Sequence, residues 1–397
     1  MNPDVRRYQA LGPSPRRLFG TGPMNPDPRV LRALGLPLLG QFDPEFTAIM
    51  NEVGDLCRFV FRTSNGQAFP ISGTSRAGLE AGLCSVLEPH DRVVVGVAGR
   101  FGELLAEIST RCGADVTPVL AEWGRVLDPD ALRKAVAEVR PKVVALVHGD
   151  TSTGVLQPLE NLAGAAHAHG AAVLVDAVLT LGGVPVETDR WGLDICVAGT
   201  QKCLGCPSGM APITYTSDVE RLIAGRHMPV QSNYLDLGQI QAYWGPERLN
   251  HHTLPTSMTY GLREALRLIY EEGLETRWAR HHRAGAALHA GIEAMGLRLF
   301  GDPAHRLPML AIVEVPAGVS EPGVREMLLR RHNMEIMAAF GALRGRAWRI
   351  GFMGYNAEVQ NVLQFLEAFE DVLIASGARV PRGDAIDAAN ARAGSGR

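Results

Sequence analysis

The fold of this chain is decided by Val173-Leu174-Val175-Asp176 and Ile195-Cys196-Val197-Ala198-Gly199-Thr200-Gln201-Lys202. Each stretch is a short apolar run that ends in polar residues, which is typical of a buried strand in a parallel sheet. Lys202 follows Asp176 by 26 residues, which is enough for a strand end, a crossover and the end of a neighbouring strand. Because ligands bind beyond the carboxyl ends of such strands, we expect this carboxylate and this amine to share one site.

A Gly/Ser/Thr turn, Ser72-Gly73-Thr74-Ser75-Arg76, opens a helical pattern upstream of both strands. Such a turn offers N–H groups and hydroxyls to a phosphate at the positive end of a helix. Taken singly, the turn reads as an ordinary helix cap, and Asp176 and Lys202 read as solvated charges. Together they predict a site for pyridoxal phosphate, which needs a phosphate cradle, a carboxylate for its pyridine nitrogen and a lysine for a Schiff base.

The composition is that of a soluble globular protein, long enough for one large domain and a smaller one. The chain has 397 residues, 46% of them hydrophobic, and a formal net charge of −3. A negative net charge argues against nucleic acids and anionic membranes as partners. No apolar run reaches the roughly 20 residues that a membrane helix needs. Residues 1–7 are not followed by the apolar core of a secretory signal, so we expect a cytoplasmic protein.

The six cysteines are scattered along the chain, which fits a reducing compartment better than a disulfide framework. Cys203 and Cys206 form a C-x2-C pair directly after Lys202, but the sequence has no second pair to complete a structural metal site. We therefore expect no metal here and interpret both cysteines as small side chains packed around a turn.

Short apolar runs alternate with helical patterns, which predicts an α/β fold with a mostly parallel sheet covered by helices on both faces. We expect strands at 92–97, 142–147 and 173–175, helices at 45–62, 102–112 and 159–169, and a turn at 149–154. A long helical pattern covers 256–297, and strands at 310–315 and 346–350 with a helix near 323–331 follow it. The predicted organisation is an N-terminal arm (1–20), a large cofactor-binding domain (21–265), a small α/β domain (266–380) and a disordered tail (381–397).

Six segments, in the same order along the chain, match one known family: Ser72 to Ala81, His148 to Val155, Val175-Asp176-Ala177, Gln201-Lys202, His251-His252-Thr253 and Trp348-Arg349-Ile350-Gly351. Over nearly its whole length the chain resembles the class V aminotransferases of the pyridoxal-phosphate fold-type I superfamily. Within that family it is similar to the alanine/serine–glyoxylate aminotransferases.

The resemblance implies roles for the matching side chains. Lys202 would hold the cofactor and move a proton between substrate and cofactor, and Asp176 would pair with the pyridinium. The residues that would cradle the phosphate are Thr74, Ser75, Arg76 and Gln201. Thr151 would lie near the phenolic oxygen. Phe101 would stack on the pyridine ring, although a core position suits it equally well. Arg349 would bind the substrate carboxylate with its planar fork.

The segment at His251-His252-Thr253 has two implications. In the family, the segment around Thr253 reaches the phosphate of the neighbouring subunit, which implies a homodimer with a shared active site. His251 and His252 are adjacent on an extended segment, so we expect their side chains to point apart and to make poor joint metal ligands.

Two positions depart from most glyoxylate aminotransferases. Gln41 and Phe42 stand where many relatives have a His-Arg pair, and Asn250 stands where many have a Tyr. An amide donates and accepts hydrogen bonds at once, which suits a urea-like group, although either amide could simply fill space. The segments 40–46, 233–237 and 243–253 resemble the (S)-ureidoglycine–glyoxylate aminotransferases of purine catabolism.

The resemblance therefore implies a ping-pong transfer between a small-molecule amino donor, (S)-ureidoglycine, and a 2-oxo acid acceptor, glyoxylate, giving oxalurate and glycine. One alternative is an alanine– or serine–glyoxylate aminotransferase with the same mechanism. A cysteine desulfurase would need a mobile cysteine loop, and nothing places Cys203 or Cys206 on one. A non-catalytic cofactor-binding protein is disfavoured because Lys202, Asp176 and Arg349 are all present.

Overall fold

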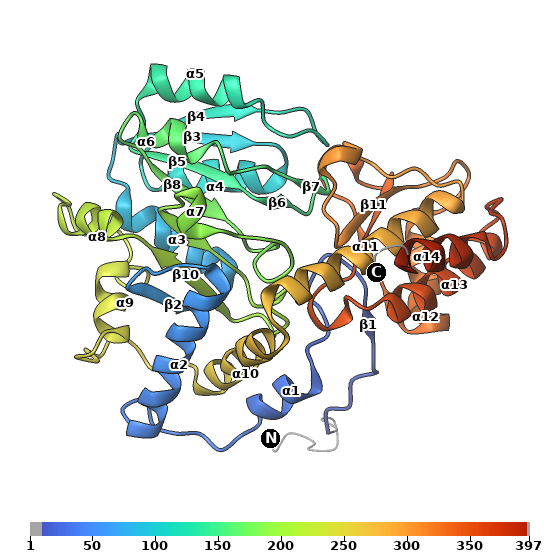
Figure 1. Ribbon diagram of the computed structural model, residues 1–397, viewed down its shortest axis with the longest axis horizontal. Helices are drawn as coiled ribbons and strands as arrows, with labels where there is room; N and C mark the ends of the chain where they lie inside the picture. Colours follow the sequence, from blue (N-terminus) through green and yellow to red (C-terminus); the bar gives the residue numbers. More distant parts are fainter. Residues whose placement is uncertain (1–9, 395–397) are drawn as a thin grey trace, which may run out of the picture.

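The computed structural model describes residues 10–394 and has a seven-stranded sheet at its centre (Figure 1). The strands of this sheet are β2 (Gln67–Ser72), β3 (Arg92–Val97), β4 (Asp115–Leu120), β5 (Val143–Val147), β8 (Ala172–Asp176), β9 (Ile195–Val197) and β10 (Met210–Tyr215). Their order in space is β2-β10-β9-β8-β5-β3-β4, and β10 runs antiparallel to both of its neighbours while the other pairs are parallel. The predicted α/β fold with a mostly parallel sheet is confirmed.

The register of the central strands aligns their carboxyl ends. Val147 of β5 lies opposite Asp176 of β8, and Asp176 lies opposite Val197 of β9. The segments that follow these three strands therefore leave the sheet at one edge. Polar residues in those segments meet there, as expected for a ligand site in a parallel sheet.

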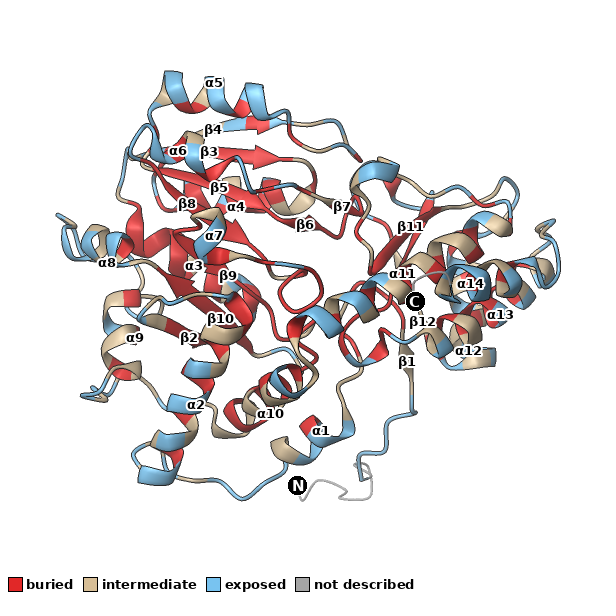
Figure 2. Cartoon of the chain, in the orientation of Figure 1, coloured by how far each residue is buried: buried red, intermediate tan, exposed pale blue. Residues whose placement is uncertain are grey.

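Helices cover both faces of the sheet, so successive strand residues enter different cores. Val94, Val144 and Val173 face one core, while Val93, Val143 and Leu174 face the other. The first core is covered by α2 (Pro44–Phe61), α5 (Pro129–Val139), α6 (Ala163–His167) and α10 (Thr256–Glu272), and the second by α3 (Ser75–Val86), α4 (Arg100–Arg111), α8 (Ser217–Ala224) and α9 (Leu237–Trp244). Figure 2 shows most of these strands buried between the helices, whereas the edge strand β4 is partly exposed.

A smaller three-stranded sheet lies beside the large one, on the right in Figure 1. Its order is β11 (Leu310–Glu314), β14 (Ala347–Gly351) and β13 (Met337–Ala338). The helices that pack with it are α11 (Leu274–Ala294), α12 (Glu321–His332), α13 (Val359–Ala375) and α14 (Asp384–Gly394). The N-terminal β1 (Arg17–Leu18) pairs in parallel with β12 (Met334–Glu335), so the start of the chain is joined to its C-terminal part.

The remaining elements are short. Helices α1 (Pro28–Leu34) and α7 (Thr188–Trp191) flank the large sheet, and β6 (Gly149–Asp150) pairs with β7 (Val155–Leu156) as a hairpin beside the site. Single 3-10 turns occupy Pro303–His305, Gly341–Leu343 and Gly354–Asn356.

Several element predictions differ from the structure. The long helix expected over 256–297 is two helices, divided at Gly273, whose φ of 79° is accessible to glycine but unfavourable for other residues. The helix expected over 159–169 is confined to α6, and the residues on either side of it form turns. The prediction that 381–397 is disordered is wrong for α14. Its small residues Ala385 and Ala389 are buried against neighbouring helices, including α11.

The predicted boundary at residue 265 lies within α10. This helix packs against α1 and α2, whereas α11 packs against α13 and α14. The division into a large and a small domain remains a prediction, and residues 1–9 of the predicted arm and 395–397 of the predicted tail lie outside the described residues.

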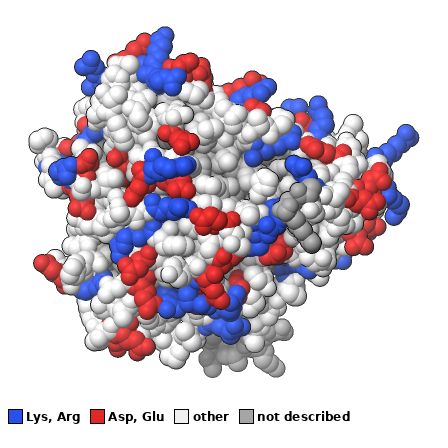
Figure 3. Space-filling view, in the orientation of Figure 1, with Lys and Arg blue, Asp and Glu red and all other residues white. Residues whose placement is uncertain are grey.

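Charges of both signs are interspersed over the face shown in Figure 3, without one large area of a single sign. Among the helices of residues 10–394, none combines the length and apolar character needed to span a membrane.

Candidate active site

A cavity of about 400 Å³ opens at the carboxyl edge of the large sheet. It is lined by residues from five segments that are distant in sequence, namely Thr74, Ser75, Arg76, Leu79, Phe101, Leu104, Gly149, Thr151, Asp176, Val178, Leu179, Gln201 and Lys202. The structure thus brings together eight of the residues that the sequence singled out as cofactor ligands. Thr253, the ninth, does not line this cavity, and neither do the three expected substrate ligands Gln41, Asn250 and Arg349.

Asp176 is the last residue of β8, and its carboxylate is buried. One oxygen, Oδ1, accepts a hydrogen bond of 2.9 Å from the backbone N–H of Val178. Burial raises the pKa of Asp176 to about 7, and the hydrogen bond from Val178 offsets only part of that effect. A carboxylate held in this way favours a cationic partner, because a positive charge would compensate its burial.

Lys202 lies in the turn after β9, with its Nζ donating a hydrogen bond to the carbonyl of Thr21. Burial and then the nearby positive charge of Arg349 lower the pKa of Lys202 to about 8. The neutral amine is therefore more accessible at neutral pH than that of an exposed lysine, which suits a nucleophile or a proton carrier.

The contact of Lys202 with the N-terminal segment was not predicted. Gly22 has a φ of 106°, and a Cβ at this position would lie 2.6 Å from Lys202 Nζ. Only glycine accommodates both the backbone conformation and the approach of the amine. The sequence signal for this contact is the cluster of turn-forming residues Thr21-Gly22-Pro23.

The N-terminus of α3 forms another wall of the cavity. Its cap residue Thr74 makes no side-chain hydrogen bond to the first turn. The hydroxyl of the buried Ser75 lies 3.0 Å from Gln201 Nε2 and 3.2 Å from Gln201 Oε1, so these two predicted residues are held together. Arg76 adds an exposed positive charge at the rim. Hydroxyls, an uncapped helix N-terminus and a guanidinium are the donors that a phosphate requires.

Asp150, which was not predicted from the sequence, forms hydrogen bonds beside the cavity. Its Oδ1 accepts hydrogen bonds from the N–H and hydroxyl of Ser152, and its Oδ2 accepts one from the N–H of Phe101 at 3.1 Å. This buried carboxylate thereby fixes Thr151 and Phe101 on two sides of the cavity. The turn at 149–154 was recognised from the sequence, but the acidic residue within it was not assigned a role.

Arg349 is buried on β14 and points toward the turn that carries Thr151. Its Nε donates to the carbonyl of Ala338 at 2.8 Å and its Nη1 to the carbonyl of Thr151 at 3.4 Å. Its guanidinium lies over the ring of Phe340, 3.8 Å from the centroid. Burial lowers the pKa of Arg349 to about 10, so it remains cationic at neutral pH. Its Nη2 contacts only the sulfur of Met337, at 4.0 Å, among the described residues, which leaves donor capacity on this nitrogen.

Gln41 and Asn250 lie beside each other, although they are far apart in sequence. Gln41 Nε2 donates to Asn250 Oδ1 at 3.1 Å. Gln41 Oε1 is buried and finds no hydrogen-bond partner among the described residues. A buried acceptor without a partner costs about 1–3 kcal/mol, so a ligand N–H would be favoured at this point.

The expectation that His251 and His252 point apart is wrong. Their Nδ1 atoms lie 2.7 Å from each other, because the segment bends there instead of remaining extended. His251 Nε2 also lies 3.0 Å from the carbonyl of Asn233, and His252 Nε2 lies 2.6 Å from the hydroxyl of Ser72. Within residues 10–394, no group of three or more His, Cys, Asp or Glu side chains is arranged to bind a metal ion.

The residues that line the cavity fit the charge pattern of pyridoxal phosphate. One wall supplies phosphate donors, the sheet edge supplies the buried carboxylate of Asp176, and Lys202 supplies an amine of lowered pKa. Phe101 supplies an aromatic surface on another side. These groups match the anionic, basic and aldehyde-bearing parts of one cofactor.

Comparison with known proteins gives one consistent result. The family model "Aminotransferase class-V" matches residues 38–358. The (S)-ureidoglycine–glyoxylate transaminase of Bacillus subtilis (strain 168) is 48% identical over 94% of this chain and 94% of its own length. A crystal structure of ureidoglycine–glyoxylate aminotransferase from Bacillus subtilis superposes with a TM-score of 0.95 at 49% identity, covering 97% of this chain and 99% of the other. The alanine–glyoxylate aminotransferase of Callithrix jacchus is 39% identical over 90% of this chain and 87% of its own length.

Proposed function

Because this chain belongs to the class-V aminotransferase family, we propose that it transfers the amino group of (S)-ureidoglycine to glyoxylate, giving oxalurate and glycine. The observation that carries the choice of donor is the Gln41–Asn250 pair, in which the buried oxygen Gln41 Oε1 has no hydrogen-bond partner in residues 10–394. The enzyme is a pyridoxal-phosphate-dependent aminotransferase, as its family and its relatives indicate.

We propose that the cofactor occupies the cavity at the sheet edge. When bound, pyridoxal phosphate supplies the electron sink that stabilises negative charge at the substrate α-carbon. Asp176 would keep the pyridine nitrogen protonated, and Lys202 would hold the cofactor and then move the proton released from the α-carbon. The phosphate would be bound by Thr74, Ser75, Arg76 and Gln201, with Phe101 against the ring and Thr151 near the phenolic oxygen.

Arg349 would bind the carboxylate that ureidoglycine and glyoxylate share. Both substrates carry this group next to the reacting carbon, so one cation can serve both half-reactions. The free donor capacity on Nη2 supports this role, and the backbone bonds to Ala338 and Thr151 would hold the fork in place.

The ureido group would be recognised by Gln41 and Asn250. The oxygen Gln41 Oε1 would accept an N–H of the substrate, which relieves the cost of leaving it unpaired. Since these amides and Thr253 do not line the cavity of their own chain, we propose a homodimer in which each subunit completes the other's site. We also propose a cytoplasmic location, because all six cysteines are buried free thiols.

The experiment that tests the function is donor-dependent absorption of the holoenzyme. Ureidoglycine freshly generated from allantoate, alanine and serine are mixed with separate samples. We expect ureidoglycine alone to abolish the cofactor's visible band and glyoxylate to restore it. Loss of the band with alanine or serine only would make the protein an ordinary glyoxylate aminotransferase, which the 39% identity to such an enzyme keeps as the second candidate. No response to any donor would indicate a non-catalytic protein.

Replacing Gln41 and Asn250 with the residues common in glyoxylate aminotransferases should change which amino donor the enzyme prefers. For Gln41→His with Asn250→Tyr, we expect kcat/KM for ureidoglycine to fall roughly 100- to 1,000-fold, because two hydrogen-bonding groups for the ureido moiety are lost. Turnover of alanine should be retained. Steady-state assays with each donor measure this. Gln239→His, a change at an exposed amide on α9, is the matched control. Unchanged ureidoglycine turnover in the double variant would contradict the assignment.

The rate at which the cofactor-free protein binds pyridoxal phosphate should depend on pH through the pKa of the Lys202 amine. Its pKa of about 8 means that the neutral amine, which attacks the aldehyde, becomes the main form above that pH. For protein freed of cofactor, we expect the capture rate to rise about tenfold per pH unit below 8 and to level off above it. Stopped-flow absorbance measures this rate. In Arg349→Gln the levelling should occur at higher pH, since a neighbouring positive charge is removed. A wild-type rate that still rises at pH of about 10 would contradict the expectation.

A further inference from the structure

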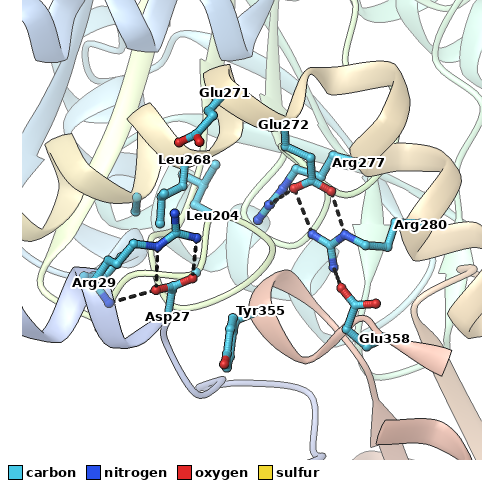
Figure 4. Close-up of a pocket in the computed structure, with 13 residues that line it drawn as sticks. Asp27, Arg29, Leu204, Leu268, Glu271, Glu272, Arg277, Arg280, Tyr355 and Glu358 are labelled. Carbon is cyan, nitrogen blue, oxygen red and sulfur yellow. Dashed lines mark hydrogen bonds and ion pairs between the residues drawn. The ribbon is translucent and has the colours of Figure 1, made fainter. Parts of the chain in front are cut away.

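Two arginines at the start of α11 share one carboxylate at the end of α10 (Figure 4). Arg277 Nη1 lies 2.7 Å from Glu272 Oε2, and Arg280 Nε lies 2.6 Å from Glu272 Oε1. Burial raises the pKa of Glu272, but hydrogen bonds and charge from the two arginines outweigh it, so the pKa lies below its ordinary value. The carboxylate therefore stays ionised and holds both guanidinium groups in fixed orientations.

Arg277 ties α11 to the turn that carries Lys202. Its side chain is buried, and its Nη2 donates to the carbonyl of Cys203 at 2.7 Å, one residue after Lys202. Its Nε donates to the carbonyl of Gly182 at 3.0 Å. All three nitrogens of the guanidinium are thus engaged, which leaves this side chain little freedom to move.

Arg280 and His281 tie the same helix to the turn that follows the strand of Arg349. Arg280 Nη1 donates to the carbonyls of Gly354 and Ala357, each at 3.0 Å. His281 Nε2 accepts from the N–H of Gly354 at 2.9 Å, and its Nδ1 lies 2.8 Å from the carbonyl of Arg277. A carbonyl only accepts, so the proton sits on Nδ1 and Nε2 is free to accept. Burial lowers the pKa of His281 to about 3, which keeps this neutral form at neutral pH.

The two turns touch each other. A Cβ at Gly354 would lie 3.3 Å from the carbonyl oxygen of Lys202 and 3.3 Å from Gly205 Cα. Gly354 has a φ of 57°, so its left-handed conformation and this close approach both favour glycine. A shift of either turn would therefore be transmitted to the other.

We propose that Arg277 and Arg280, joined through Glu272, are positioning residues that set the separation between the Lys202 amine and the Arg349 guanidinium. This inference rests on the proposed function. In that reaction the amino donor must present its amine near Lys202 while Arg349 holds its carboxylate, so the separation of the two side chains matters. Through these contacts the start of α11 holds both the turn that carries Lys202 and the turn that follows the strand of Arg349. We call Arg277 and Arg280 the clamp. Displacement of reacting groups by about 1 Å can cost roughly 100-fold in rate.

Glu358 Oε1 lies 3.4 Å from Arg280 Nη1 and adds a second carboxylate to this cluster, whereas the other charged residues drawn in Figure 4 are paired elsewhere. Asp27 binds Arg29, and Glu271 binds Arg267 on the same helix. Arg267 is partly exposed and forms ion pairs with two glutamates of α10, Glu264 and Glu271, so it offers a matched control for the loss of an arginine ion pair.

The test compares Arg277→Lys, Arg280→Gln and the control Arg267→Met in full-length holoenzyme. Lysine keeps the charge of Arg277 but cannot bond Gly182, Cys203 and Glu272 with a planar fork. We expect both clamp variants to raise KM for glyoxylate and to lower kcat/KM roughly 10- to 100-fold, with the control unchanged. The second readout uses protein freed of cofactor, in which the pH dependence of Lys202 acetylation is followed by mass spectrometry. Because the charge of Arg349 depresses the Lys202 pKa, a greater separation should move the acetylation midpoint toward that of an ordinary lysine.

Three outcomes decide the inference. A raised KM together with a shifted acetylation midpoint supports it. A wild-type KM and midpoint in both folded variants, with thermal unfolding as the check on folding, overturns it. A lower melting temperature with unchanged KM and midpoint also overturns it, because the arginines would then only stabilise the fold. If wild-type protein transaminates no donor, the proposed function fails, while the acetylation midpoint still decides whether the clamp sets the position of Lys202.

Discussion

Lys202→Ala is expected to lower kcat/KM by roughly 10,000-fold or more, because one side chain would act as both the cofactor anchor and the proton carrier. The variant should fold, since the amine makes one hydrogen bond, to the carbonyl of Thr21, among the described residues. Lys202→Arg should be equally inactive, because a guanidinium keeps its proton at neutral pH. Steady-state assays measure the loss, and small primary amines added to the alanine variant should restore part of the rate.

The chain offers an unusually clear control for this prediction. It contains three lysines, Lys134, Lys142 and Lys202. Lys142 is paired with Asp91 at 2.7 Å before the start of β5, at the edge of the sheet opposite the cavity, and Lys134 is exposed on α5. Borohydride reduction of the holoenzyme followed by peptide mapping should label Lys202 alone. Labelling of Lys134 or Lys142, or full activity in Lys202→Ala, would refute the assignment.

The parts of the site that lie at strand ends could be predicted from the sequence. Asp176 and Lys202 each follow a short apolar run, and parallel strands bring their carboxyl ends to one edge. The turn before α3 could also be predicted, because glycine and hydroxyl residues that precede a helix are a local sequence signal. These predictions needed only local patterns and the general geometry of α/β sheets.

The contacts that depend on the path of the whole chain could not be predicted. Thr21 reaches Lys202 across about 180 residues of sequence, and Arg277 reaches Cys203 from the distant helix α11. No periodicity or spacing connects such pairs. The bend that joins His251 to His252 is a backbone detail of an irregular segment, and the simple alternation rule for extended chain failed there. The helix α14 was missed because its composition resembles that of a disordered tail, whereas its burial depends on α11 and the other helices around it.

Asp176→Asn should separate the electrostatic role of this carboxylate from its shape. Asparagine can keep the hydrogen bond from Val178 but cannot carry the negative charge that holds the pyridine nitrogen protonated. We expect kcat to fall roughly 100- to 1,000-fold, which is typical when one preorganised electrostatic group is removed. Pre-steady-state absorbance should locate the loss in the proton-transfer step. Asp194→Asn is the matched control, because Asp194 is also buried and accepts from a backbone N–H, that of Val173, but precedes β9 at the other end of the sheet.

The same variant should be no less stable than wild type when both lack cofactor. Burial raises the pKa of Asp176 from 3.8 to about 7, so between these values the folded state binds more protons than the unfolded state. The free energy of unfolding of wild type should therefore fall as pH rises through this window, by up to about 4 kcal/mol, and asparagine should remove that fall. Urea titrations of both proteins between acidic and mildly alkaline pH measure the difference. If asparagine instead destabilises the cofactor-free protein at mildly alkaline pH, nearby positive charges must already stabilise the carboxylate of Asp176. Its role would then be structural, and the proposal that it pairs with the pyridine nitrogen of the cofactor would be contradicted.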